Sequence, residues 1–201
     1  MLRLNQDSNR ISVLCVNRNS IYKTIPGLDV WDEDRDAYNF KGTNPVITHA
    51  PCAQWSKMKS FANDNPREKE LAFFCLNKVM VNGGVFEHPS GSSFFKAANV
   101  PRSSIYSVDQ FWWGLECKKP TWLFFSQCKP LPYSLRFEAV THQIKTGFHG
   151  KNKVKNGMKW MQKSRHAYTT IDFAKWLIAS VQNSINAEES FRLYNERYKL
   201  G

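Results

Sequence analysis

The chain has 201 residues, a formal net charge of +11 and an aromatic content of 14%. This length suits one hydrophobic core and is short for two, so a single domain spanning residues 1–201 is expected. No apolar run approaches the roughly 20 residues of a membrane span, and the first residues lack the apolar core of a signal peptide. We therefore expect a cytoplasmic protein that does not enter a membrane.

The N-terminal half alternates between strand and helix patterns. Short apolar runs predict buried strands at residues 11–16, 29–32 and 45–49. A helix is predicted up to residue 82, because Asn65 suits its cap, Pro66 suits its first turn, and two glycines follow it.

The C-terminal half continues this alternation. A strand is predicted to begin at residues 85–86 and to end at residues 87–89, followed by an extended aromatic segment at 108–113 and a further strand at 121–126. Helices are predicted at residues 171–181 and 187–198. The pattern as a whole predicts an α/β fold with a mainly parallel, Rossmann-like sheet flanked by helices.

Two reactive side chains follow neighbouring strands of this predicted sheet. Cys52 lies just after the strand at residues 45–49, and Glu87 ends the next strand, with one crossover helix between them. Because ligands of such sheets bind beyond the carboxyl ends of the strands, we expect the thiol and the carboxylate to share one cleft. Taken singly, Cys52 also fits a packed core thiol and Glu87 a loop cap.

These residues carry a resemblance to a known family. The sequence APCAQ at residues 50–54 resembles the Pro-Cys loop of cytosine-C5 DNA methyltransferases, and FEHP at residues 86–89 resembles their glutamate loop. Residues 110–122 look like a segment of short phage-type relatives, and residues 170–178 look like their closing helix. The resemblance implies a methyltransferase-like sheet that acts on cytosine in DNA or in a nucleotide.

The resemblance also implies roles for individual residues. Cys52 would be the nucleophile that adds to the ring, and Glu87 would be the acid that hydrogen-bonds the ring nitrogen. Residues expected beside the substrate are His49, Gln54, Trp55, His88, Lys118 and Lys119. A base in duplex DNA would have to flip out of its stack to reach them.

The methyl donor of this family is S-adenosylmethionine, and its expected contacts are Asn17, Ser20 and Asp32. The chain departs from the family here, because the first strand leads into residues 17–23 with no glycine before Gly27. Asp32 suits a ribose hydroxyl, and it equally suits a surface acid among its acidic neighbours.

Positive charge is concentrated in one segment. Residues 141–165 contain six lysines, one arginine and no acidic residue, with aromatic residues and histidines between them. We interpret this basic insertion as a contact for nucleic acid, with DNA the expected partner, although a solvated basic loop has the same composition. The residues expected to contact phosphates are Lys145, Lys151, Lys153, Lys155 and Lys159.

The cysteines predict neither disulfides nor a metal site. The chain has five cysteines and no Cys-x-x-Cys pair, which favours reduced thiols. His49 and Cys52 have a spacing that can begin a zinc site, but no second pair follows nearby. We therefore expect no bound metal.

Three interpretations of function remain open. The first is a cytosine-C5 methyltransferase. The second is a non-catalytic nucleic-acid-binding phage protein that keeps the methyltransferase scaffold and acts against host defence. The third is an enzyme that acts on a nucleotide base with a different cofactor, which the altered segment at residues 17–23 favours.

Overall fold

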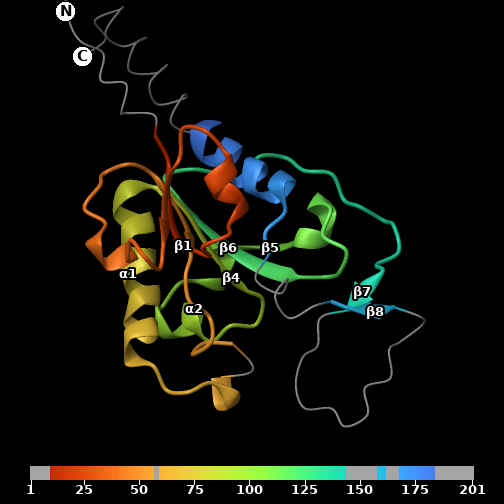
Figure 1. Ribbon diagram of the computed structural model, residues 1–201, viewed down its shortest axis with the longest axis horizontal. Coiled ribbons are helices and arrows are strands. Elements are labelled where there is room, and N and C mark those ends of the chain that lie inside the picture. The colour runs from red at the N-terminus through yellow and green to blue at the C-terminus, as the bar shows by residue number, and fades with distance from the viewer. Residues whose placement is uncertain (1–9, 57–58, 144–157, 162–167, 184–201) are drawn as a thin grey trace, which may run out of the picture.

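The computed structural model describes residues 10–56, 59–143, 158–161 and 168–183. Its centre is a six-stranded sheet in the order β2-β1-β3-β4-β6-β5 (Figure 1). The strands are β1 (Ser12–Val16), β2 (Asp29–Asp32), β3 (Val46–His49), β4 (Gly84–Pro89), β5 (Ile105–Asp109) and β6 (Pro120–Ser126).

The sheet is mainly parallel, as the sequence predicts. Strands β2, β1, β3 and β4 run parallel to one another. Strand β6 is antiparallel to both of its neighbours, β4 and β5. The fold is therefore α/β with a mixed, mostly parallel sheet of Rossmann-like type, which confirms the predicted fold class.

Helix α1 (Pro66–Asn82) is the crossover between β3 and β4. The Asn65 side chain accepts a hydrogen bond from the Glu68 amide at 3.2 Å, which caps the helix as predicted. Gly83, with φ of 77°, ends it. The apolar face of α1 packs on one side of the sheet in a cluster that includes Leu14 and Phe86.

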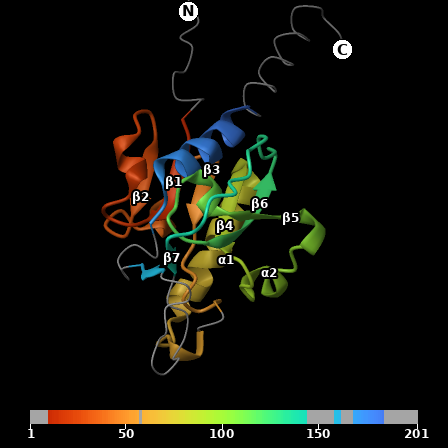
Figure 2. The same ribbon diagram turned by 90° about the vertical axis from the view of Figure 1, so that its right-hand side faces the viewer.

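The opposite face of the sheet is covered by a second helix. Residues 171–183 are helical, and Phe173 and Leu177 pack in a cluster with Val13 and Leu123 of the sheet (Figure 2). The helix predicted at residues 187–198 lies outside the described residues. No helix in the described ranges has the length and apolarity that a membrane span requires.

The remaining elements are short. They are η1 (Ile21–Thr24), η2 (Ala37–Asn39), η3 (Lys59–Phe61), α2 (Phe94–Ala97), η4 (Arg102–Ser104), η5 (Gln110–Trp113) and a β7 (His142–Gln143) and β8 (Lys159–Trp160) pair. The segment predicted as extended at residues 108–113 was only partly right, because β5 stops at Asp109. The Asp109 carboxylate accepts a hydrogen bond from the Phe111 amide at 3.1 Å and turns the chain into η5.

Gly84 sets how closely β3 and β4 approach at their start. A Cβ at this position would lie 1.9 Å from the Val46 carbonyl oxygen, and the backbone φ is 120°. Only glycine tolerates both conditions. The glycine therefore allows the pairing that aligns the carboxyl ends of β3 and β4 further along.

Candidate functional site

The site begins with the register between β3 and β4. His49 and Glu87 are direct partners in this parallel pair, at the carboxyl ends of the two strands. The loop that carries Cys52 leaves β3 immediately afterwards. The structure therefore brings the Cys52 loop and Glu87 to the same edge of the sheet.

Glu87 is held by hydrogen bonds to both of its carboxylate oxygens. Its side-chain Oε2 lies 3.1 Å from His49 Nδ1, and Oε1 accepts from Gln110 Nε2 at 3.3 Å. Burial, at 9% exposure, raises the pKa of this carboxyl, but His49 and the charge of Lys119 outweigh burial and leave the pKa below its usual value. Glu87 is therefore a buried carboxylate anion.

His49 connects Glu87 to Tyr22. The Tyr22 hydroxyl lies 3.0 Å from His49 Nε2, and the Tyr22 side chain is fully buried. Burial, and then the charge of Glu87, raises the Tyr22 pKa well above its ordinary value, so the phenol stays protonated. We assign the Tyr22 hydroxyl as donor to Nε2 and the Nδ1–H of His49 as donor to Glu87.

Gln110 extends this chain of hydrogen bonds on the far side of Glu87. Its Nε2 also donates to Thr121 Oγ1, at 3.0 Å. Its Oε1 is buried and has no hydrogen-bond partner among the described residues. Sequence reasoning missed both Tyr22 and Gln110. Gln110 begins the segment that resembles phage-type relatives, which was a usable signal, whereas nothing local marks Tyr22 as a partner of His49.

Cys52 is half-buried at the start of a tight turn. Its carbonyl accepts hydrogen bonds from the amides of Trp55, at 3.0 Å, and Ser56, at 2.8 Å. Burial raises the pKa of the Cys52 thiol, Glu87 raises it further, and Lys119 only partly opposes them. The thiol is therefore protonated and less nucleophilic than a free cysteine near neutral pH.

The two candidate lysines differ. Lys119 is close enough to influence the pKa of both Cys52 and Glu87, and its Nζ donates to the Tyr168 carbonyl at 3.0 Å. Lys118 is exposed, and it makes no contact with Cys52 or Glu87 among the described residues. Of this pair, the structure supports Lys119 as a site residue.

Three other residues expected beside the substrate also make contacts that hold the Cys52 loop in place. Gln54 Nε2 donates to the Asn63 carbonyl at 2.6 Å, and the Trp55 carbonyl accepts from the Ser93 amide at 2.9 Å. His88 is fully buried, and its Nε2 donates to the Pro51 carbonyl at 3.4 Å. His88 is thus enclosed by protein in the structure and has no exposed surface toward the expected substrate. Burial lowers its pKa to about 4, so it is neutral.

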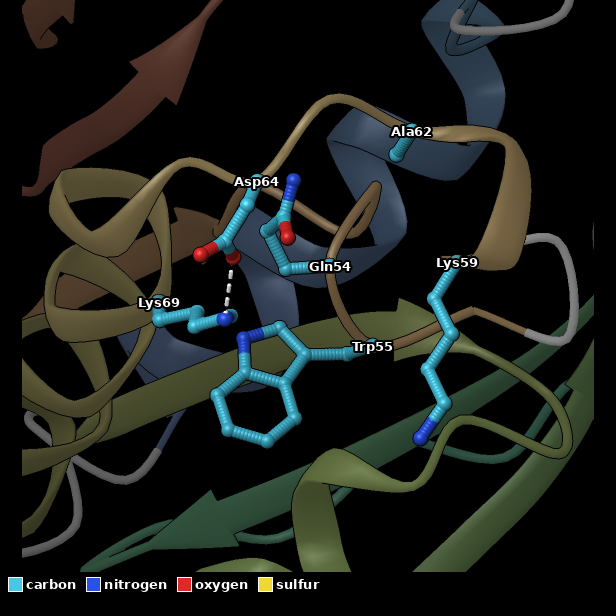
Figure 3. A pocket seen from close by; sticks show the side chains of 6 residues that line it. All are labelled: Gln54, Trp55, Lys59, Ala62, Asp64 and Lys69. Carbon is cyan, nitrogen blue, oxygen red and sulfur yellow. Dashed lines mark hydrogen bonds and ion pairs between the residues drawn. The ribbon is translucent and has the colours of Figure 1, made fainter.

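An open hollow lies beside this loop (Figure 3). Its volume is about 360 Å³, and its lining residues are Gln54, Trp55, Lys59, Ala62, Asp64 and Lys69. The Trp55 indole forms one wall, and Lys69 is paired with Asp64 above it. Lys59 makes no ion pair with a described residue. The hollow thus offers the aromatic ring of Trp55, three residues after Cys52, and the Lys59 ammonium, which has no ion-pair partner among the described residues.

Of the three residues expected to contact S-adenosylmethionine, Asn17 is exposed, whereas Asp32 and Ser20 are engaged in contacts within the protein. The Asp32 carboxylate is occupied by an ion pair with Lys23 and by the amides of Asp34, at 3.1 Å, and Arg35, at 3.3 Å. Ser20 Oγ is used within the turn, where it accepts from the Tyr22 amide at 3.4 Å. The buried Tyr22 ring lies where an open, glycine-rich turn would admit the cofactor.

The other expectations concern metals and the basic insertion. Among the described residues, no group of three or more His, Cys, Asp or Glu side chains is placed to hold a metal ion. Most of the basic insertion, including Lys145, Lys151, Lys153 and Lys155, lies outside the described residues. Lys159 is exposed on β8, which pairs with β7.

Comparisons with known proteins give no assignment. No family model matches the chain, and no curated protein or solved structure is significantly similar to it. A functional assignment therefore depends on the geometry and chemistry of the residues described above.

Proposed function

We propose that this chain is a nucleic-acid-binding protein on a methyltransferase-like scaffold, and that it holds an unpaired base at the sheet edge between Cys52 and Glu87. The observation that carries the proposal is the meeting of this thiol and this carboxylate at one sheet edge, where the loop that carries Cys52 continues into a hollow lined by Trp55, Lys59 and Lys69. An aromatic wall suits a base, and an unpaired lysine suits its phosphate. The net charge of +11 favours a polyanionic partner.

The protonation states favour binding over methyl transfer. Addition to a cytosine ring requires a thiolate at Cys52 and a protonated carboxyl at Glu87. The free protein holds the reverse arrangement, with a raised thiol pKa and a lowered carboxyl pKa. Moving the proton from sulfur to oxygen is therefore uphill, and the ion pair between Lys23 and Asp32 also leaves the methyl donor without its expected ribose acceptor.

Cytosine-C5 methyl transfer is the second candidate, and one observation favours it. A thiol and a carboxylate at the ends of adjacent parallel strands are the two groups that this reaction needs. A base whose ring nitrogen hydrogen-bonds Glu87 would weaken the contact of Glu87 with His49 and raise the carboxyl pKa, which would shift the proton balance toward the reactive form. This candidate requires a methyl donor, for which the described residues show no fitting site.

Protection of Cys52 from alkylation tests the base site directly. We expect a single-stranded oligonucleotide containing cytosine to slow the reaction of Cys52 with iodoacetamide, measured by mass spectrometry of the modified peptide. Cys128 is the internal control, since it lies on another segment after β6, where its thiol donates to the Gly84 carbonyl at 3.2 Å. Unchanged Cys52 reactivity at saturating oligonucleotide would remove the proposed base site.

Fluorescence anisotropy at several salt concentrations tests the nucleic-acid contact. We expect the double variant K153Q/K155Q to weaken binding and to reduce the salt dependence, whereas K41Q/K96Q removes the same charge outside the basic insertion and should change binding little. Cys52→Ser, which is close in size to the native residue, should weaken binding less than K153Q/K155Q does. Equal effects of the two lysine pairs would argue against the basic insertion as the contact.

Incubation with labelled S-adenosylmethionine separates the two candidates. We expect no 5-methylcytosine in single-stranded or duplex DNA, and no rise in Tm with the methyl donor, because a ligand that binds the native state raises Tm. Methylated product that disappears in Cys52→Ser would replace the first proposal with the second.

A further inference from the structure

Two thiols meet in the core between β1 and α1. Cys15 Sγ lies 3.4 Å from Cys75 Sγ, although the residues are 60 positions apart in the chain. Cys75 is fully buried on the inner face of α1, and Cys15 is half-buried at the end of β1. Neither residue belongs to the Cys52–Glu87 site.

An irregularity in the pairing of β1 places Cys15 on the side of the sheet that α1 covers. The register of β1 with β2 shifts between Leu14 and Val16, so Cys15 is left out of the pairing, as in a β-bulge. In a regular strand Cys15 and Leu14 would face opposite sides of the sheet. Here both pack in the cluster that contains Cys75, whereas Val16 packs on the other side.

The backbone at Cys15 is unusual in a second way. Its φ is +61°, in the left-handed region that residues other than glycine and asparagine rarely adopt. Such a conformation costs free energy, and it persists only where the surrounding structure enforces it. The bulge and the positive φ together present one sulfur to the other.

We propose that Cys15 and Cys75 are a redox pair that closes into a disulfide by exchange with a low-molecular-weight disulfide, such as glutathione disulfide. The Cys15 thiolate attacks one sulfur of glutathione disulfide, which forms a mixed disulfide and releases one glutathione thiolate. Cys75 then loses its proton and attacks Cys15 Sγ, which releases the second glutathione. Two protein thiols are oxidised and one glutathione disulfide is reduced to two glutathione thiols.

The order of attack follows from access and acidity. Cys15 is the partly exposed residue of the pair, whereas Cys75 is buried, so we expect Cys15 to meet the small disulfide first. The hydrogen bond with Cys15, and then burial, holds the pKa of Cys75 well above its ordinary value, so Cys75 acts second. Closing the bond requires the sulfurs to approach by roughly 1.3 Å, which side-chain rotation with a small backbone shift supplies.

Mass spectrometry on the wild-type chain tests this proposal. After equilibration with glutathione disulfide and alkylation of the remaining thiols, we expect one peptide cross-link between Cys15 and Cys75, reversed by dithiothreitol. The cross-link constrains the unfolded chain, so Tm should rise by several degrees in the oxidised form. The Cys128→Ser variant should form the same cross-link, and Cys15→Ser should not.

Two outcomes would overturn the proposal. One is a stable glutathione adduct on Cys15 with Cys75 still free to alkylate after unfolding. The other is a cross-link between a different pair of cysteines. Because the wild-type measurement decides by itself, a failure of Cys15→Ser to fold leaves the result interpretable.

Discussion

His49 and Glu87 are register partners on two parallel strands, and the ring Nδ1 lies 3.1 Å from the carboxylate Oε2. Both side chains are mostly buried. The contact between them offsets part of the free energy that burying each polar group costs. The contact with His49 holds the Glu87 carboxylate in place, and the negative charge of Glu87 raises the pKa of the Cys52 thiol.

This relationship predicts strong coupling between the two residues. His49→Phe should lower the free energy of unfolding by about 3 kcal/mol, because it leaves a buried carboxylate with Gln110 as its remaining hydrogen-bond partner among the described residues. Urea denaturation measures the change. In a double-mutant cycle with Glu87→Leu, the combined loss should be smaller than the sum of the two single losses by at least about 1 kcal/mol. Additive losses would show that the pair does not act as a unit.

The buried His88 predicts loss of stability in mild acid. Its pKa is about 4 in the fold and near 6.5 when unfolded, so below pH 6.5 the unfolded chain takes up a proton that the folded chain does not. Stability should therefore fall as the pH drops from 6.5 to 4, by about 3 kcal/mol from this group.

Urea titrations across this pH range measure the effect. His88→Phe should flatten the dependence, because phenylalanine preserves the stacking on Phe86 and has no proton to exchange. An unchanged slope in His88→Phe would assign the effect to other groups.

We expect the alkylation rate of the Cys52 thiol to depend on the charges of Glu87 and Lys119. Glu87→Gln removes a negative charge that raises the Cys52 pKa, so alkylation at a fixed pH should be faster than in the wild type. Lys119→Met removes the opposing positive charge and should slow it. Rates against pH, followed by mass spectrometry, measure both shifts. The rate at Cys128, whose pKa burial raises to about 11, should stay the same in every variant.

Gly84 predicts a severe effect from a single methyl group. Gly84→Ala would place a Cβ 1.9 Å from the Val46 carbonyl oxygen in a backbone conformation unsuited to alanine. We expect a loss of at least about 3 kcal/mol in unfolding free energy, or no folded protein. Gly27→Ala is the control, because its φ is also positive, at 82°, but no atom lies within 4 Å of the added Cβ. It should cost about 1 kcal/mol.

The core of the fold was predictable from the sequence because its signals are local. Apolar runs marked β1, β3 and β4, and Asn65 with Gly83 marked the ends of α1. The meeting of the Cys52 loop with Glu87 at one edge required only that successive strands lie parallel and adjacent. These inferences depend on hydrophobic periodicity, helix caps and the order of the elements, all of which can be recognised in the sequence.

The rest depended on contacts between distant segments. The burial of Tyr22 against His49 arises because η1 folds back over the sheet edge, which no local pattern marks. The antiparallel direction of β6 likewise follows from its pairing with β4 and β5 and not from its composition. The positive φ of Cys15 breaks a run that reads as an uninterrupted strand.

The bridge from Tyr22 to His49 lies where the strand order reverses, between β1 and β3. Open α/β sheets commonly admit elongated, two-part molecules at that reversal, with one part lying over each half of the sheet. This chain fills the reversal with the side chains of Tyr22 and His49. The protein should therefore reject dinucleotide cofactors that span the reversal, whereas a base at the carboxyl ends of β3 and β4, with the rest of its strand outside the sheet, does not need that space.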